Sequence, residues 1–111
     1  MTTGAYSVVY PVTDLDAAKT LYGALLGEPH TDTPYYVGYN VNGFEIGLAP
    51  GANQGVGGPV TYWRVPDVAA AVAELDAAGA SVLRDTGDVG GGTVLAIVAD
   101  PEGNPIGLIQ A

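Results

Sequence analysis

The chain repeats one order of segments, and this duplication limits the folds that are open to it. The first copy reads strand, helix, strand, strand, strand over residues 6–49, and the second reads in the same order over 60–110. The tripeptide Ile-Gly-Leu occurs in the last strand-like run of both copies, at 46–48 and 106–108. Repeats of this length are too long for a solenoid unit. The sequence therefore predicts an α+β fold of two tandem βαβββ modules.

Each copy contains one amphipathic helix framed by start and stop signals. Asp14 and Asp67 stand where an N-cap is needed, since a carboxylate can accept the free N–H groups of the first turn. Gly27 and Gly79 stand where each helix closes. Apolar residues recur between them at helical spacing. These are Leu15, Ala18, Leu21, Tyr22, Leu25 and Leu26 in the first helix, and Val68, Ala71, Val72, Leu75 and Ala78 in the second.

Two tight turns are predicted from their residue types. Asn42-Gly43 favours a hairpin between 35–41 and 44–49, because both residues tolerate positive φ. In Asp-Pro-Glu-Gly-Asn at 100–104, proline presets φ, glycine takes the left-handed position, and the aspartate can bond back to the turn. The predicted organisation is a single domain, 1–111. Its first module covers about 5–50, a flexible linker covers 51–58, and the second module covers about 59–111.

One helix can cover only one face of a sheet, so the other face of each module is expected to help form a cup. Period-two alternation assigns the strand residues to the two faces. The cup face receives Ser7, Val9, Pro11, Glu45, Gly47, Ala49, Val60, Tyr62, Arg64, Pro105, Gly107 and Ile109. The core under the helices receives Tyr10, Val12, Ile46, Leu48, Trp63, Val65, Ile106 and Leu108. The parity of 35–41 stays open, so Tyr35 and either Tyr39 or Val37 are further cup candidates.

Composition excludes several classes of function. Twelve acidic side chains against three basic ones give a net charge of −9, which argues against phosphate-backbone binding and favours a cationic ligand. The absence of cysteine excludes disulfides, a thiolate nucleophile, an iron–sulfur cluster and a zinc ribbon. The sequence shows neither a secretory signal nor a membrane span, so we expect a cytoplasmic protein.

Three segments carry a family resemblance: VTDLDAAKTLYGALLG at 12–27, VPDVAAAVAELDAAGASV at 65–82 and VADPEGNPIGLIQ at 98–110. They resemble the vicinal oxygen chelate superfamily of glyoxalases, bleomycin-resistance proteins and extradiol dioxygenases. The metal-dependent members carry His, Glu, His and Glu at four positions, which the resemblance places at Ser7, Gly47, Val60 and Gly107. None of these residues is a good ligand for a divalent metal. The resemblance therefore implies a member without a cofactor and without metal-dependent glyoxalase or dioxygenase activity.

Two residues are candidates for a site of another kind. His30, the sole histidine, shares one face with Glu28 and Asp32 if 28–32 is extended, and such a trio can hold a metal; the alternative is an ordinary exposed histidine. Glu45 has the parity of Gly47 and is the candidate for a general base or a partner for a cation. The alternative for Glu45 is an edge-strand glutamate that points at solvent.

The expected function is metal-independent binding or sequestration of an aromatic or cationic small molecule, as in antibiotic resistance of the bleomycin type. The candidate ligand-binding residues are Ser7, Val9, Tyr35, Tyr39, Glu45, Gly47, Val60, Tyr62, Arg64, Gly107 and Ile109. The two glycines are expected to widen the cup for a bulky ligand. The alternatives are a metal-free lyase or isomerase that uses Glu45 or a tyrosine, and a partner domain with a vestigial cup. We expect a homodimer, with each cup formed within one chain or between two.

Overall fold

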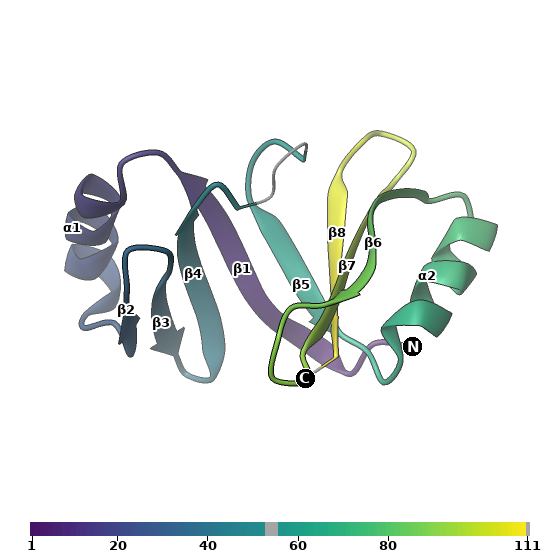
Figure 1. Ribbon diagram of the computed structural model, residues 1–111, viewed down its shortest axis with the longest axis horizontal. Coiled ribbons are helices and arrows are strands. Elements are labelled where there is room, and N and C mark those ends of the chain that lie inside the picture. Colours follow the sequence, from purple (N-terminus) through teal and green to yellow (C-terminus); the bar gives the residue numbers. More distant parts are fainter. Residues whose placement is uncertain (53–55, 111) are drawn as a thin grey trace. The chain divides into compact units, whose positions relative to one another are not determined.

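The computed structural model describes residues 1–52 and 56–110, and the chain divides into two compact units (Figure 1). Residues 7–60 form the N-terminal unit, and residues 1–6 together with those from 61 onward form the C-terminal unit. The fold is α+β and consists of two βαβββ modules, as predicted. Part of the predicted linker, residues 53–55, lies outside the described residues. Neither helix in the described part of the chain is long and apolar enough to cross a membrane.

The N-terminal unit is a four-stranded sheet covered on one face by a helix (Figure 1). Its strands follow the order β2-β3-β4-β1, with β1 parallel to β4 and the other pairs antiparallel. β1 begins in the C-terminal unit and continues into this one. The elements are β1 (Gly4–Val12), α1 (Leu15–Leu26), β2 (Thr31–Asp32), β3 (Val37–Val41) and β4 (Phe44–Pro50).

Helix α1 is held on its sheet by one apolar stripe. Of the residues that the helical spacing indicated, the stripe contains Leu15, Ala18, Tyr22 and Leu26, which pack against Val37, Tyr39, Ile46 and Leu48. Leu21 and Leu25 were expected in the same stripe, but their side chains are 70% and 78% exposed. A helix on an open sheet contacts its partner along one side only, so apolar residues on its flank stay in solvent.

The C-terminal unit has the same architecture. Its strands follow the order β5-β8-β7-β6, with β5 parallel to β8. The elements are β5 (Val60–Arg64), α2 (Val68–Ala77), β6 (Ser81–Asp88), β7 (Val94–Ala99) and β8 (Pro105–Gln110). The core under α2 contains Val65, Val68, Ala71, Val72, Ala96, Val98 and Leu108. Strand β6, with eight residues, is the longest of these four strands.

Trp63 does not lie in the core under α2, where alternation assigned it. Its side chain is 39% exposed, although it pairs in register with the buried Leu108. Helix α2 packs mainly against β6, β7 and β8. Strand β5 therefore lies beyond the cover of the helix, and correct parity is not sufficient to bury the indole.

Local signals fixed the helix starts and the first hairpin as predicted. The Asp14 carboxylate accepts a hydrogen bond from the backbone N–H of Ala17 at 3.0 Å. The Asp67 carboxylate accepts one from Ala70 at 3.1 Å. The turn between β3 and β4 has positive φ at both residues, 52° at Asn42 and 89° at Gly43. This pair of angles matches the twist of the flanking strands.

The turn at 100–104 is closed by the side chain of Asp100. Its Oδ1 accepts from the backbone N–H groups of Glu102 at 2.9 Å and Asn104 at 2.8 Å, and its Oδ2 accepts from the Asn104 amide at 2.9 Å. Gly103 has φ 88°. These hydrogen bonds, above all that from the Asn104 side chain, lower the pKa of the Asp100 carboxyl. The turn fixes the register of β8 on β7, in which Ile97 pairs with Gly107.

We predict that Asp100→Asn destabilises the protein in a pH-dependent way. The folded-state pKa of Asp100 lies below its ordinary value of 3.8, so its ionised form stabilises the fold above that pH. The difference in unfolding free energy from the wild type should be largest near neutral pH and vanish as the pH falls through the lowered pKa. Urea unfolding at several pH values measures it. Asp76→Asn, which removes the same charge from α2, is the matched control, and an Asp100→Asn deficit that is constant with pH would contradict this account.

Candidate functional site

The face of the N-terminal sheet that lies opposite α1, here called its open face, carries the candidate site. Val37 and Tyr39 pack under α1, which settles the parity of β3 that the sequence left open. Gly38, the residue between them, therefore lies on the open face. Tyr39 is buried on the helix side and donates to the backbone oxygen of Lys19 at 3.4 Å, so its assignment to the cup wall, like that of Val37, is wrong.

Tyr36, rather than Tyr35, supplies the aromatic ring of the open face. Tyr35 was a cup candidate, but it lies in the turn before β3 and is 82% exposed. The hydroxyl of Thr33 accepts from the backbone N–H of Tyr36 at 3.0 Å and donates to the carbonyl of Tyr36 at 3.1 Å. The Tyr36 ring lies on the same face as Gly38, because a Cβ at Gly38 would lie 2.7 Å from it. Once Val37 is assigned to the core, alternation identifies Tyr36.

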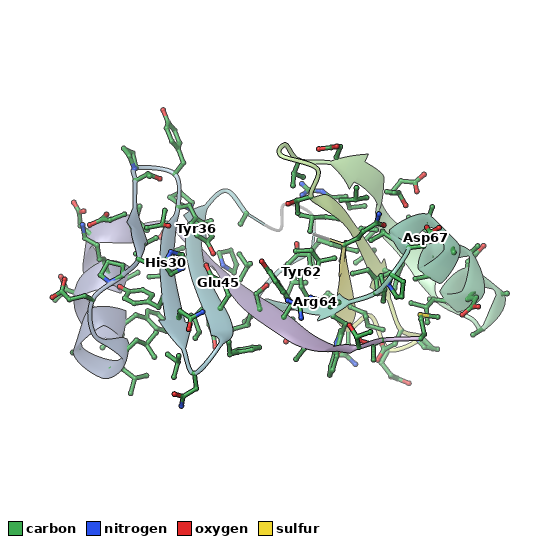
Figure 2. All side chains as sticks on the ribbon, turned by 90° about the horizontal axis from the view of Figure 1, so that it is seen from below. His30, Tyr36, Glu45, Tyr62, Arg64 and Asp67 are labelled. Carbon is green, nitrogen blue, oxygen red and sulfur yellow. The ribbon has the colours of Figure 1, made fainter. Side chains whose placement is uncertain are left out.

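Three polar side chains meet on the open face (Figure 2). The Tyr36 hydroxyl donates to Glu45 Oε2 at 2.6 Å, and His30 Nε2 lies 2.7 Å from Glu45 Oε1. His30 Nδ1 lies 2.7 Å from the Thr31 hydroxyl. We call His30, Tyr36 and Glu45 the Glu45 cluster. The Glu45 side chain is 19% exposed, so the alternative of a solvent-facing edge glutamate does not apply.

Two glycines form the floor of the Glu45 cluster. Gly38 and Gly47 pair in register on β3 and β4. A Cβ at Gly47 would lie 2.6 Å from the Tyr36 ring, and a Cβ at Gly38 would lie 2.7 Å from both that ring and Glu45 Oε2. The cluster can lie this close to the sheet only because neither residue has a side chain. Gly47 therefore does not widen a cup, as its sequence position suggested, because a tyrosine ring fills the space.

The C-terminal unit shows the same contact. Tyr62 pairs in register with Gly107, and a Cβ at Gly107 would lie 2.6 Å from the Tyr62 ring. Tyr62 is 5% exposed, and its burial raises the pKa of its hydroxyl. The glycine of each Ile-Gly-Leu segment thus lies under a tyrosine ring, and the expected widening is wrong at both positions.

The remaining candidate residues lie on the strands to which the sequence assigned them. Ser7 pairs with Glu45 and is buried, and Val9 pairs with Gly47. Ile109 in the C-terminal unit is buried, and so is Val60, the last residue of the N-terminal unit and the first of β5. Arg64, which Figure 2 labels beside Tyr62 on β5, has its guanidinium 4.8 Å from the centroid of the Tyr6 ring. A ligand-binding role for these residues stays a prediction.

The residues at the four family positions do not fit a divalent metal. Ser7, Gly47, Val60 and Gly107 offer one neutral hydroxyl among them, and tyrosine rings cover both glycines. The alternative trio around His30 is not assembled. Asp32 binds the Lys19 ammonium at 3.1 Å, while His30 binds Glu45. Across residues 1–52 and 56–110, no group of three or more His, Asp or Glu side chains is arranged to hold a metal.

Comparison with known families and proteins gives concordant matches. The family described as "Glyoxalase-like domain" matches residues 7–109. Proteins of Mycobacterium tuberculosis and Mycobacterium bovis, both named "Putative glyoxylase CFP32", are 33% identical over 111 residues. The match covers 89% of this chain but 42% of each relative. The chain thus spans less than half the length of these relatives.

Solved structures share the fold at low sequence identity. Methylmalonyl-CoA epimerase from Streptomyces coelicolor superposes with a TM-score of 0.78 at 18% identity and covers 100% of this chain and 96% of its own. The epimerase from Mycobacterium tuberculosis gives 0.70 at 24%, covering 98% and 88%. A glyoxalase/bleomycin resistance protein/dioxygenase superfamily member from Vibrio splendidus gives 0.70 at 18%, covering 94% and 95%. Likeness at these identities shows the fold alone.

We predict that Gly47→Ala displaces the Tyr36 ring and breaks its hydrogen bond to Glu45. The ring must move because the added Cβ would lie 2.6 Å from it. Loss of this bond, with some repacking, should lower the free energy of unfolding by about 1–2 kcal/mol. In a Tyr36→Ala background the same substitution should cost less than about 0.5 kcal/mol, because the obstructing ring is gone. Denaturant unfolding of the wild type, Gly47→Ala, Tyr36→Ala and the double variant tests this prediction. An equal loss of unfolding free energy from Gly47→Ala in both backgrounds would refute the contact.

Proposed function

The chain belongs to the glyoxalase-like domain family, and from this premise we propose that it binds a small molecule at the Glu45 cluster without a metal. The observation that supports the proposal is the carboxylate of Glu45, which is mostly buried and accepts hydrogen bonds from two side chains of its own chain. Each carboxylate oxygen has a further lone pair available to a ligand. The class of ligand follows from the groups that surround this acceptor.

A cationic or hydrogen-bond-donating ligand suits the cluster best. A carboxylate screened from solvent gains more from a positive partner than one in water does. The Tyr36 ring beside Glu45 can add a cation–π contact. The net charge of −9 attracts cations over longer distances.

The neighbouring open face favours a planar apolar body on the ligand. Gly47 is flanked on β4 by Glu45 and Ala49, and on β1 it pairs with Val9. Ala49 in turn pairs with Pro11. These side chains are small or stiff, and such a surface suits a flat ring system held by one polar anchor. Sequestration of an aromatic cation, as an antibiotic-resistance protein would perform it, is the form of binding that we propose.

Proton transfer is the second candidate function, and the hydrogen bonds of the cluster favour it. A phenol and an imidazole share one carboxylate, so a proton can be taken up and returned at a fixed place. In this alternative Glu45 removes a proton from a carbon next to a carbonyl group, and Tyr36 or His30 donates to the developing oxyanion. The epimerases that share the fold, and the relatives named as glyoxylases, support an isomerase or lyase of this kind as the alternative.

We expect the purified protein to bind benzylamine, a cation at neutral pH, more tightly than the neutral benzyl alcohol. Glu45→Gln keeps the shape of the side chain but removes its charge, so it should weaken benzylamine binding about tenfold and abolish the preference. Glu28→Gln removes the same charge from an exposed position and should change little. Calorimetric titration measures all three proteins. Equal binding of the two compounds by the wild type, or a stoichiometric metal on which binding depends, would refute the proposal.

For the second candidate, we expect the protein to exchange a proton next to a carbonyl group for solvent deuterium. The methylglyoxal–glutathione adduct is a suitable first substrate for this NMR assay. Glu45→Gln should slow the exchange by about a hundredfold or more, since it removes the base. Tyr36→Phe should slow it less. An exchange rate that Glu45→Gln leaves unchanged would rule out Glu45 as the base.

A further inference from the structure

Arg84 is an arginine without an acidic partner in a strongly acidic protein. The ion pairs among the described residues are Lys19–Asp32 and His30–Glu45. Arg64 has its guanidinium over the Tyr6 ring. In the part of the chain that the structure describes, no carboxylate lies within salt-bridge distance of Arg84. The chain has twelve acidic residues, yet none of those described pairs with this guanidinium, so it is available to an external anion.

The sheet of the C-terminal unit places Arg84 in one row with Tyr62. Tyr62 on β5 pairs with Gly107 on β8, Gly107 pairs with Ile97 on β7, and Ile97 pairs with Arg84 on β6. Residues paired in this way point to the same face of a sheet. Ile97 is buried but does not belong to the cluster under α2. The row therefore lies on the face opposite α2, the open face of this unit.

An irregularity in β6 is what turns Arg84 to the open face. Val82 pairs with Val98, which packs in the core under α2, and Arg84 pairs with the very next residue of β7, Ile97. Leu83 is thus an extra residue, and the register shifts again between Arg84 and Gly87. In a regular strand Arg84 would share the face of Val82 and lie beside the helix. Bulges commonly re-aim one side chain next to a binding site.

Tyr62 offers a second donor over the same row. Its ring covers Gly107, with which it pairs in register. Burial keeps this hydroxyl protonated by raising its pKa, and the charge of Arg84 is near enough to act in the opposite direction. A neutral phenol and a guanidinium in one row of the sheet provide donors and no negative charge.

We propose that Arg84 and Tyr62 form an anion-binding position that takes the carboxylate of a small apolar acid. The guanidinium can bind both carboxylate oxygens, and the Tyr62 hydroxyl can donate to one of them. The Tyr62 ring, which covers Gly107, provides the apolar surface for the hydrocarbon part of the ligand. This position stands on the C-terminal unit alone and goes beyond the function proposed for the Glu45 cluster.

Benzoate and its neutral isostere benzamide are the probes that test this position. We expect benzoate to bind at least fivefold more tightly than benzamide, because benzoate forms charge-assisted hydrogen bonds with Arg84 and benzamide forms only neutral acceptor contacts. Chemical-shift titration of the labelled full chain measures both affinities. Arg84→Gln should remove that preference. Tyr62→Phe keeps the ring over Gly107 and should weaken benzoate binding about threefold to tenfold. Lys19→Gln removes the same charge from α1 and should keep the preference.

Three results would overturn the inference. The first is equal affinity of the wild type for benzoate and benzamide. The second is an equal loss in Lys19→Gln and Arg84→Gln, which would indicate a general effect of charge. The third is benzoate-induced shifts that centre on the Glu45 cluster instead of Gly107 and Ile97. Glu45→Gln should leave benzoate binding unchanged, so failure of this inference is distinguishable from failure of the proposed function.

Discussion

The contact between a tyrosine ring and a glycine of the sheet determines the chemistry of both open faces. In the N-terminal unit this contact lets the Tyr36 ring lie on Gly47 with its hydroxyl on Glu45. In the C-terminal unit it buries Tyr62 over Gly107. An aromatic ring that lies on a strand glycine also compensates for the missing side chain. The two positions where relatives carry a metal-binding carboxylate have therefore been filled with aromatic surface and a phenol, and they are not holes in the sheet.

Most of the fold could be predicted because its signals are local. The caps at Asp14 and Asp67 and the turn of Asp100 each depend on hydrogen bonds between residues at most four apart. The assignments that failed depend on how far a helix extends over its sheet. Leu21 lies on the flank of α1 that does not contact the sheet, and Trp63 lies on a strand that α2 does not cover, so both apolar side chains stay exposed. Sequence periodicity predicts which face a side chain points to, but it does not predict how far the neighbouring helix or sheet extends over that face.

The candidate site was predictable only where its residues lie in regular strands. Alternation placed Glu45 on the open face correctly, because β4 is a regular strand. Its partner His30 comes from the irregular segment before β2, where no period applies, and Tyr36 is identified only after Val37 has been assigned to the core. Alternation also misplaces Arg84, although this residue lies within a strand. A strict count of alternation along β6 gives it the wrong face, because the extra residue Leu83 reverses the parity.

The net charge of the chain is a weak guide to the charge of its ligand. The charge of −9 acts over long distances, but at physiological ionic strength it is screened beyond about 8 Å. Contacts inside a desolvated site are much less screened, so the groups within a few ångströms of the ligand decide its charge. In the two proposals made above, the groups around Glu45 favour a cation, whereas those around Arg84 and Tyr62 favour an anion. The same acidic chain can therefore present faces of opposite preference, and only the local arrangement of side chains distinguishes them.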